Sequence, residues 1–319
     1  MTDEPEPFDY IARMNEFYYS QPPMNVLQDR LILLALRATK AEELGELTAD
    51  LEWGELRLHQ RRPEDSPRDL AEEERARTAF IMTESQNLFH HAGEALIRLF
   101  LAHRARSECP WLEAASFQDF RKFRAELDAL ARTVWTQDQI DDVAFVFFGG
   151  TRPNPDDKWV EAREQAVRFL RMVAQRLHAD KNLYNATKHG LTAIGTEVSM
   201  TFAAEGSEPM LGADGTSVIF IERGAFDTKD ADKWYETTQW INPHQVVFFT
   251  QLVIDQIAAL WQVARMHHLG ADPGTVVIAN DQAMDKVVSG FPRRGPMVSM
   301  RKVVAIQNQP EQKRPKAGR

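Results

Sequence analysis

The chain has 319 residues, a formal net charge of -9 and a pI near 5.6. Hydrophobic residues make up 43% and charged residues 27% of it, which excludes collagen-like, mucin-like and fully disordered chains. The single cysteine, Cys109, excludes an intrachain disulfide and a zinc site built from cysteines.

The N-terminal residues predict a cytoplasmic location. They are acidic and spaced by prolines, and they lack the basic and apolar regions of a secretory signal. The best candidate for a membrane span covers residues 246–264, but Asp255 and three glutamines interrupt it. Such groups are costly at the centre of a bilayer, so we expect a buried helix in a protein that does not cross a membrane.

Helical spacing of apolar residues dominates most of the chain. Residues 1–24 are predicted to form an arm whose Phe17-Tyr18-Tyr19 cluster docks on the body. Proline at the first helical position, Ser116 as a capping residue, and glycines at helix ends set the predicted boundaries. The predicted helices span residues 25–47, 49–60, 67–105, 117–132, 137–148, 158–189 and 243–270.

Between the last two of these helices the pattern changes to a period of two. Residues 197–202 alternate polar and apolar, Asp214-Gly215 predicts a turn before the apolar run 218–221, and residues 234–241 are rich in aromatics and threonine. Strands so close in sequence predict an antiparallel three-stranded meander over about residues 196–241.

These elements define the expected fold class, which is mainly α (α+β): a helical bundle with a small β-meander inserted before the last long helix. We expect residues 25–269 to form a single domain and residues 270–319 to form a basic, largely irregular tail. From Lys286 to Arg319 there are nine Lys or Arg and one Glu, a net charge of +8. Such a tail can attract nucleic-acid phosphate.

Two sets of polar residues share the spacing i, i+4, i+7, i+11, which places each set on one narrow face of a helix. The first, named the Asn87 stripe, consists of Asn87, His91, Glu94 and Arg98. The second, named the His178 stripe, consists of His178, Asn182, Asn185 and His189, with Lys188 beside it. Amides and imidazoles suit directed hydrogen bonds. We therefore expect the stripes to face each other and bind a small ligand or a protein partner.

Ordinary structural roles explain the same residues. Glu94 and Arg98 have the spacing of an ion pair within a helix. Lys188-His189-Gly190 has the composition of a helix C-terminus, where cations and glycine are favoured. No complete set of metal ligands has suitable spacing, and no phosphate-binding or nucleophile motif occurs, so we expect neither metal nor cofactor.

The segment from Leu183 to Gly190, Leu-Tyr-Asn-Ala-Thr-Lys-His-Gly, resembles the Tyr-Asn-x-x-Lys-His-Gly helix end of bacterial HEPN-like helical-bundle proteins. Catalytic members of that family are RNA-cleaving toxins and defence enzymes. Their signature is Arg, four to six residues, then His, completed at a dimer interface. The resemblance thus implies a homodimer, with His189 as general acid or base and Arg98 stabilising phosphate charge.

The Arg-to-His spacing of the family occurs twice, at Arg98 with His103 and at Arg171 with His178. Two matches are about the number expected by chance, and no Arg stands at this spacing before His189. We therefore expect a non-catalytic binding module that uses a polar site between helices. Two alternatives remain open: a metal-independent RNA endonuclease of a toxin or defence system, and a structural assembly subunit, which predicts a large apolar surface patch.

Overall fold

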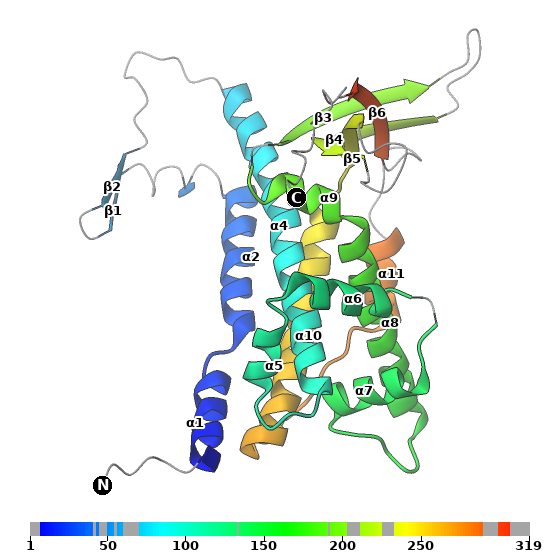
Figure 1. The fold of residues 1–319 in the computed structure, drawn as a ribbon. Coiled ribbons are helices and arrows are strands. Elements are labelled where there is room, and N and C mark those ends of the chain that lie inside the picture. Colours follow the sequence, from blue (N-terminus) through cyan, green and yellow to red (C-terminus); the bar gives the residue numbers. More distant parts are fainter. Residues whose placement is uncertain are drawn as a thin grey trace, which may run out of the picture. The chain divides into compact units, whose positions relative to one another are not determined.

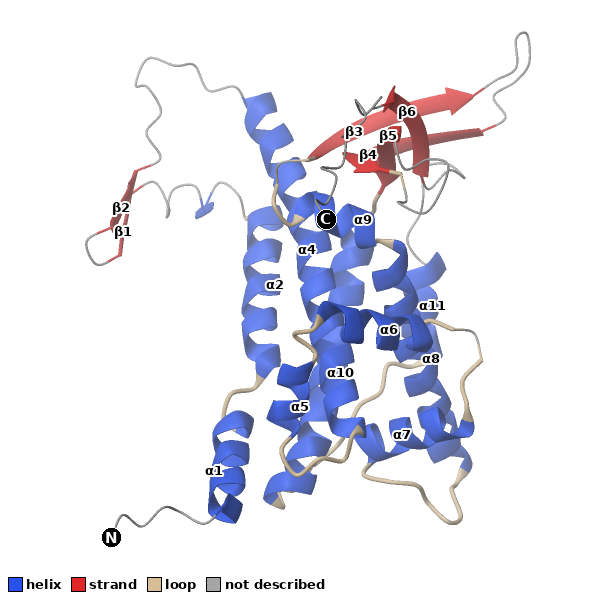
Figure 2. Ribbon diagram, viewed as in Figure 1, coloured by secondary structure: helices blue, strands red, loops and turns tan. Residues whose placement is uncertain are grey.

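The protein is mainly helical and carries a small antiparallel sheet, which confirms the predicted fold class (Figure 2). The structure is a computed structural model, and it describes residues 7–40, 43–44, 50–53, 56–59, 70–132, 134–190, 192–202, 211–224, 233–289 and 299–306. The chain divides into two compact units. The first unit holds residues 1–63, 85–181 and 243–292, and the second holds residues 64–84, 182–242 and 293–319. The single domain expected over residues 25–269 is thus shared between the two units.

The first unit is a set of helices around α10 (Figure 1). Its helices are α1 (Pro7–Tyr19), α2 (Pro23–Thr39), α5 (Pro110–Ser116), α6 (Phe120–Leu130), α7 (Gln137–Phe148), α8 (Asp157–Ala179), α10 (Pro243–Leu269) and α11 (Asp281–Ser289). The long helix α4 (Leu70–Arg104) begins in the second unit and continues into the first. The predicted helices 67–105, 137–148 and 243–270 are confirmed to within a few residues.

Helix α10 is the core helix of the first unit. It is long and apolar enough to cross a membrane, but 61% of its most apolar window is buried inside the protein. It contacts α1, α2, α7 and α11, and Trp261 is among the largest fully buried side chains. A helix packed on most of its surface is apolar nearly all round, as the sequence predicts for this segment.

The predicted N-terminal arm is the helix α1, and its aromatic cluster docks as expected. The ring centroids of Tyr18 and Tyr19 lie 5.1 and 4.9 Å from that of Trp261 in α10. Tyr18 also stacks on Trp111 of α5 at 5.7 Å. Aromatic side chains bury large apolar areas, so this cluster fixes α1 on the first unit.

Within residues 49–60, predicted as a weak helix, the described segments 50–53 and 56–59 pair as two strands instead. Strands β1 (Asp50–Trp53) and β2 (Leu56–His59) pair antiparallel, with Trp53 opposite Leu56. On each side of Gly54-Glu55, Leu or Trp occurs at every second position, which is the period of a β-strand. Over so short a segment this pattern outweighs the helix propensity of the other residues. Helix α2 accordingly ends at Thr39 and not near residue 47.

Two predicted helix boundaries are also wrong. Ser116 ends α5, where its hydroxyl donates to the Glu113 carbonyl, and Asp119 caps α6 by accepting from the Arg121 amide. The predicted helix 158–189 is broken at Asp180, which separates α8 from α9 (Lys181–Thr187). Asp180 is the C-cap of α8, and its side chain is buried and ion-paired with Arg176.

In the second unit the sheet has four strands in the order β3-β4-β5-β6, all antiparallel. They are β3 (Ala193–Phe202), β4 (Leu211–Arg223), β5 (Lys233–Trp240) and β6 (Ser299–Ile306). The expected meander corresponds to β3, β4 and β5. Asp214-Gly215 is not a turn, because both residues lie within β4 opposite Ser199 and Val198.

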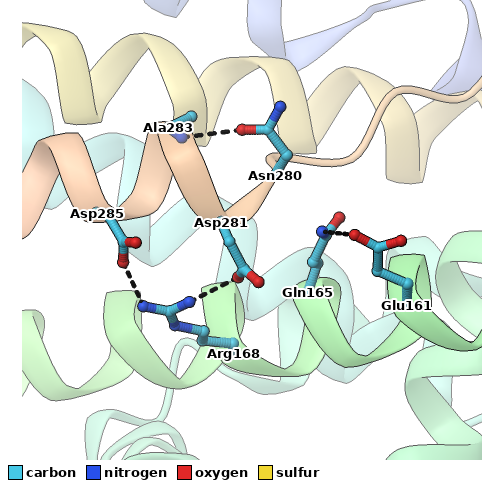
Figure 3. A network of polar contacts seen from close by, with 7 residues as sticks. All are labelled: Glu161, Gln165, Arg168, Asn280, Asp281, Ala283 and Asp285. Carbon is cyan, nitrogen blue, oxygen red and sulfur yellow. Dashed lines mark hydrogen bonds and ion pairs between the residues drawn. The ribbon is translucent and has the colours of Figure 1, made fainter.

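The tail predicted as largely irregular contributes regular structure twice. Strand β6 adds a fourth strand to the sheet by pairing with β5. Helix α11 packs in the first unit, where Asn280 caps it by accepting from the Ala283 amide at 2.9 Å. Figure 3 shows Arg168 of α8 bonded to both Asp281 and Asp285 of α11, each at 2.6 Å. Both pairings join segments distant in sequence, which the local pattern does not reveal.

Strand β3 approaches the N-terminal part of α4 closely at Gly195. A Cβ at this position would lie 2.7 Å from Cα and 2.9 Å from the carbonyl oxygen of Ala79. We expect Gly195→Ala to destabilise the second unit by about 1–3 kcal/mol, because backbone must move to admit the methyl group. Chemical denaturation followed by circular dichroism measures this. Ser199→Ala, at an exposed position of the same strand, is the control, and equal stabilities of the two variants would contradict the prediction.

Candidate functional site

The Asn87 stripe lies on α4 in the first unit, and its cation is held by three neighbours. Arg98 donates a hydrogen bond to the Phe117 carbonyl, lies 3.7 Å from Glu94, and stacks 4.1 Å above the Phe123 ring. Arg98, Glu94 and Asn87 are all half-buried. Arg98 therefore connects α4 to the segment between α5 and α6. The ion pair between Arg98 and Glu94 within α4 is the ordinary structural role that the sequence also predicted.

The other cation near this stripe comes from α2. Arg30 lies with its guanidinium 2.7 Å from Nδ1 of His91, so the imidazole accepts and the guanidinium donates. His91 is exposed. This contact connects α2 and α4 within the first unit, and it turns Arg30 toward α4.

The His178 stripe does not lie on one helix, which corrects the prediction. The four residues were expected to share a face because of a continuous helix over 158–189, and that helix ends at Ala179. His178 bonds Asp128 of α6 at 2.8 Å in the first unit. Asn182 donates to Glu222 of β4 at 2.5 Å in the second unit.

The remaining residues of this stripe are exposed at the end of α9. Asn185, Lys188 and His189 are all open to solvent, and the Lys188 ammonium lies 5.7 Å from the Tyr184 ring. Gly190 has φ +65°, the left-handed conformation predicted for a helix end. These residues form an exposed polar surface of the second unit.

Arg98 and His103 have the Arg-to-His spacing of the RNA-cleaving family, but their side chains are not available to a ligand. His103 is buried, its Nδ1 donates to the Leu99 carbonyl at 2.7 Å, and its Nε2 accepts from the Tyr19 hydroxyl at 2.7 Å. Burial lowers the pKa of His103 to about 4. Both ring nitrogens are therefore occupied by structural contacts, and a neutral imidazole is the stable form.

The sequence did not identify the residues around His103. His268 of α10 stacks on Tyr19 at 5.6 Å and lies 6.2 Å from His103, ring centroid to ring centroid. Burial and the neighbouring His267 lower the pKa of His268. The only signal in the sequence was the aromatic cluster of the arm, because the partners lie far apart along the chain.

In the second unit, the carboxylate of Glu222 joins four elements. It accepts from Asn182 of α9 at 2.5 Å and from the Thr237 hydroxyl of β5 at 2.8 Å, and it pairs with Arg301 of β6 at 2.9 Å. The Glu222 side chain is only 12% exposed. Arg301 also stacks on the Tyr235 ring at 3.6 Å. This network holds the basic strand β6 on the sheet, so Arg301 serves a structural contact.

Helix α2 carries the most exposed apolar surface of any described helix in the first unit. Leu27, Leu31 and Leu34 are buried, and α2 packs on α10. On the other side of the helix, large apolar side chains face solvent. They are Val26 (66% exposed), Leu33 (62%), Ile32 (47%) and Leu36 (38%).

Five exposed residues of this side follow a heptad spacing of three and four. We name them the α2 seam: Val26, Asp29, Leu33 and Leu36 of the helix, and Lys40, the C-cap residue directly after its last turn. Such spacing keeps residues on one line along a helix that packs against another helix. Sequence analysis missed the seam because α2 is apolar on both sides, which resembles an ordinary buried helix.

The described residues contain no group of three or more His, Cys, Asp or Glu that could hold a metal ion. Comparison of the chain with protein-family models, with curated proteins and with solved structures finds no match. The structure alone therefore carries the functional argument, and its strongest feature is the α2 seam.

Proposed function

We propose that this protein is a non-catalytic, HEPN-like helical protein of the cytoplasm that assembles with a helical segment of a protein partner through the α2 seam. The observation that supports this proposal is the row of large apolar side chains exposed along α2. Monomeric proteins rarely leave a large contiguous apolar patch in water, and such large patches mark interaction surfaces. An assembly role was the alternative that predicted this feature.

The seam specifies the chemistry of its partner. A helix that packs along α2 needs apolar side chains opposite Leu33 and Leu36, because those two form the centre of the seam. It also needs a cation opposite Asp29 and a carboxylate opposite Lys40, since unlike charges at the ends fix register and orientation.

The contacts of Arg98 and His103 argue against a cleavage site at this pair, which has the Arg-to-His spacing of the family. Arg98 is held by a carbonyl, a carboxylate and a ring, and His103 is buried with both nitrogens bonded. Cleavage would require an imidazole and a cation that can reach a phosphate together. These two side chains instead stabilise the first unit.

A designed helical peptide tests the proposed function. The peptide carries two leucines spaced to meet Leu33 and Leu36, a lysine to meet Asp29 and a glutamate to meet Lys40. We expect saturable binding to the wild-type chain by fluorescence anisotropy. Leu33→Lys should weaken binding at least about tenfold, because a buried leucine contributes about 1.5–3 kcal/mol.

Val277→Lys is the matched control, since Val277 is 66% exposed and lies outside α2. This variant adds the same charge and should bind the peptide as the wild type does. Absence of peptide binding to the wild-type chain, or equal loss in the two variants, would overturn the proposed function.

A further inference from the structure

We infer that the helix occupying the α2 seam is α2 of a second copy of this chain, running antiparallel to the first. This inference rests on the proposed function and names its partner. It follows from the order Asp29, Leu33, Leu36, Lys40 along the seam, which is self-complementary only when the two helices run in opposite directions. Val26 lies outside these four layers.

The register is set by the heptad spacing. In an antiparallel pair of identical helices, each layer joins residues whose numbers have a constant sum. A sum of 69 places Leu33 of each copy opposite Leu36 of the other and Asp29 opposite Lys40. Two apolar layers are then flanked by two layers of opposite charge.

The parallel arrangement is disfavoured by the same residues. It would place Asp29 against Asp29 and Lys40 against Lys40, and like charges across a helical interface are repulsive. A two-fold axis between Leu33 and Leu36 satisfies the symmetry of a homodimer, in which one surface must complement itself. The charges therefore select the antiparallel orientation.

The contacts of Lys40 and Arg30 within the chain are compatible with this antiparallel pairing. Lys40 pairs with Glu43 at 2.9 Å in the same chain, but both side chains are more than half exposed. An exposed pair of this kind contributes little, so Lys40 can exchange Glu43 for a carboxylate of the second copy. Arg30 is held by His91, which turns this cation toward α4. The seam contains no residue of the Asn87 or His178 stripes.

Sedimentation velocity over a range of concentrations tests the inference. We expect a reversible dimer for the wild type and dissociation at least about tenfold easier for Asp29→Lys or Lys40→Asp, because each change places like charges in two layers. The double variant carrying both changes restores the opposite charges and should regain the wild-type dimer. A double variant no better than the single ones would overturn the antiparallel register.

Disulfide crosslinking tests orientation separately. A variant carrying both Asp29→Cys and Lys40→Cys should form a covalent dimer on oxidation. Asp29→Cys alone should not, because eleven residues of helix, about 16 Å, separate the two copies of position 29 in the antiparallel pair. A covalent dimer from the single variant would establish the parallel arrangement and overturn the inference. The native Cys109 is kept in these variants, because it is buried and does not compete for the crosslink.

The two proposals fail differently. A chain that remains monomeric at high concentration, yet binds the designed peptide, overturns the second copy as occupant and leaves the proposed function intact. A chain that neither dimerises nor binds the peptide overturns both. Val277→Lys should dimerise as the wild type does. Loss of the dimer in this variant would show that α2 is not the interface.

Discussion

Glu222→Ala is expected to destabilise the second unit by about 2–4 kcal/mol and to release β6 from the sheet. The carboxylate of Glu222 is largely buried, accepts hydrogen bonds from Asn182 and Thr237, and forms an ion pair with Arg301. Its removal leaves these donors without their shared, largely buried acceptor, and unsatisfied polar groups at a buried position are costly. Hydrogen exchange of the β6 amides, together with chemical denaturation, measures both effects.

Glu236→Ala is the control for this prediction. Glu236 also bonds β6, through Lys302 at 2.6 Å, but that pair is one contact whose lysine is more than half exposed. We expect a loss below about 1 kcal/mol, as is usual for exposed ion pairs. If the two variants lower stability equally, or if β6 keeps its protection in Glu222→Ala, the network does not hold the strand.

Acid is expected to destabilise the first unit through its buried histidines. Burial lowers the pKa of His103 to about 4 and, with Arg176 and His91 adding to the effect, that of His90 to about 3. The unfolded chain has the ordinary histidine pKa of about 6.5, so between about pH 6.5 and pH 4 it binds more protons than the native protein. Stability is therefore fully present above pH 6.5 and falls as the pH drops through this window.

The expected loss from His103 alone is about 3 kcal/mol between pH 7 and pH 4, from a pKa difference near 2.5 and about 1.4 kcal/mol for each pH unit. Urea denaturation at a series of pH values measures it. His103→Gln removes the titrating group and should flatten the pH dependence by that amount, whereas His189→Gln, at an exposed position, should leave it unchanged. An unaltered slope in His103→Gln would show that this imidazole is not the acid-sensitive group.

The candidate site was only partly accessible from sequence. The amphipathic pattern placed Glu94 and Arg98 on one face of α4, and they do lie 3.7 Å apart. The prediction of the His178 stripe failed because the helix is interrupted at Asp180, which the apolar periodicity does not report. The Glu222 network joins residues from 182 to 301, so its members carry no common local signal.

Local chemistry determined the elements whose ends are set by near neighbours. Helix α7 spans the predicted residues 137–148 because Thr136 and Gln139 form a capping box and Gly149 adopts φ +78°. The aromatic and threonine-rich composition of residues 234–241 likewise predicted β5. The long helices α4 and α10 and the fold class follow from the same short-range patterns.

Tertiary structure decided everything that depends on distant partners. Residues 50–53 and 56–59 pair as strands and residues 299–306 form β6 because strands gain their hydrogen bonds from other segments, and a short strand alone is marginal. The exposed side of α2 was also undecided, because Leu31 and Leu33 are equally apolar. Only the packing on α10 buries the first and leaves the second in water.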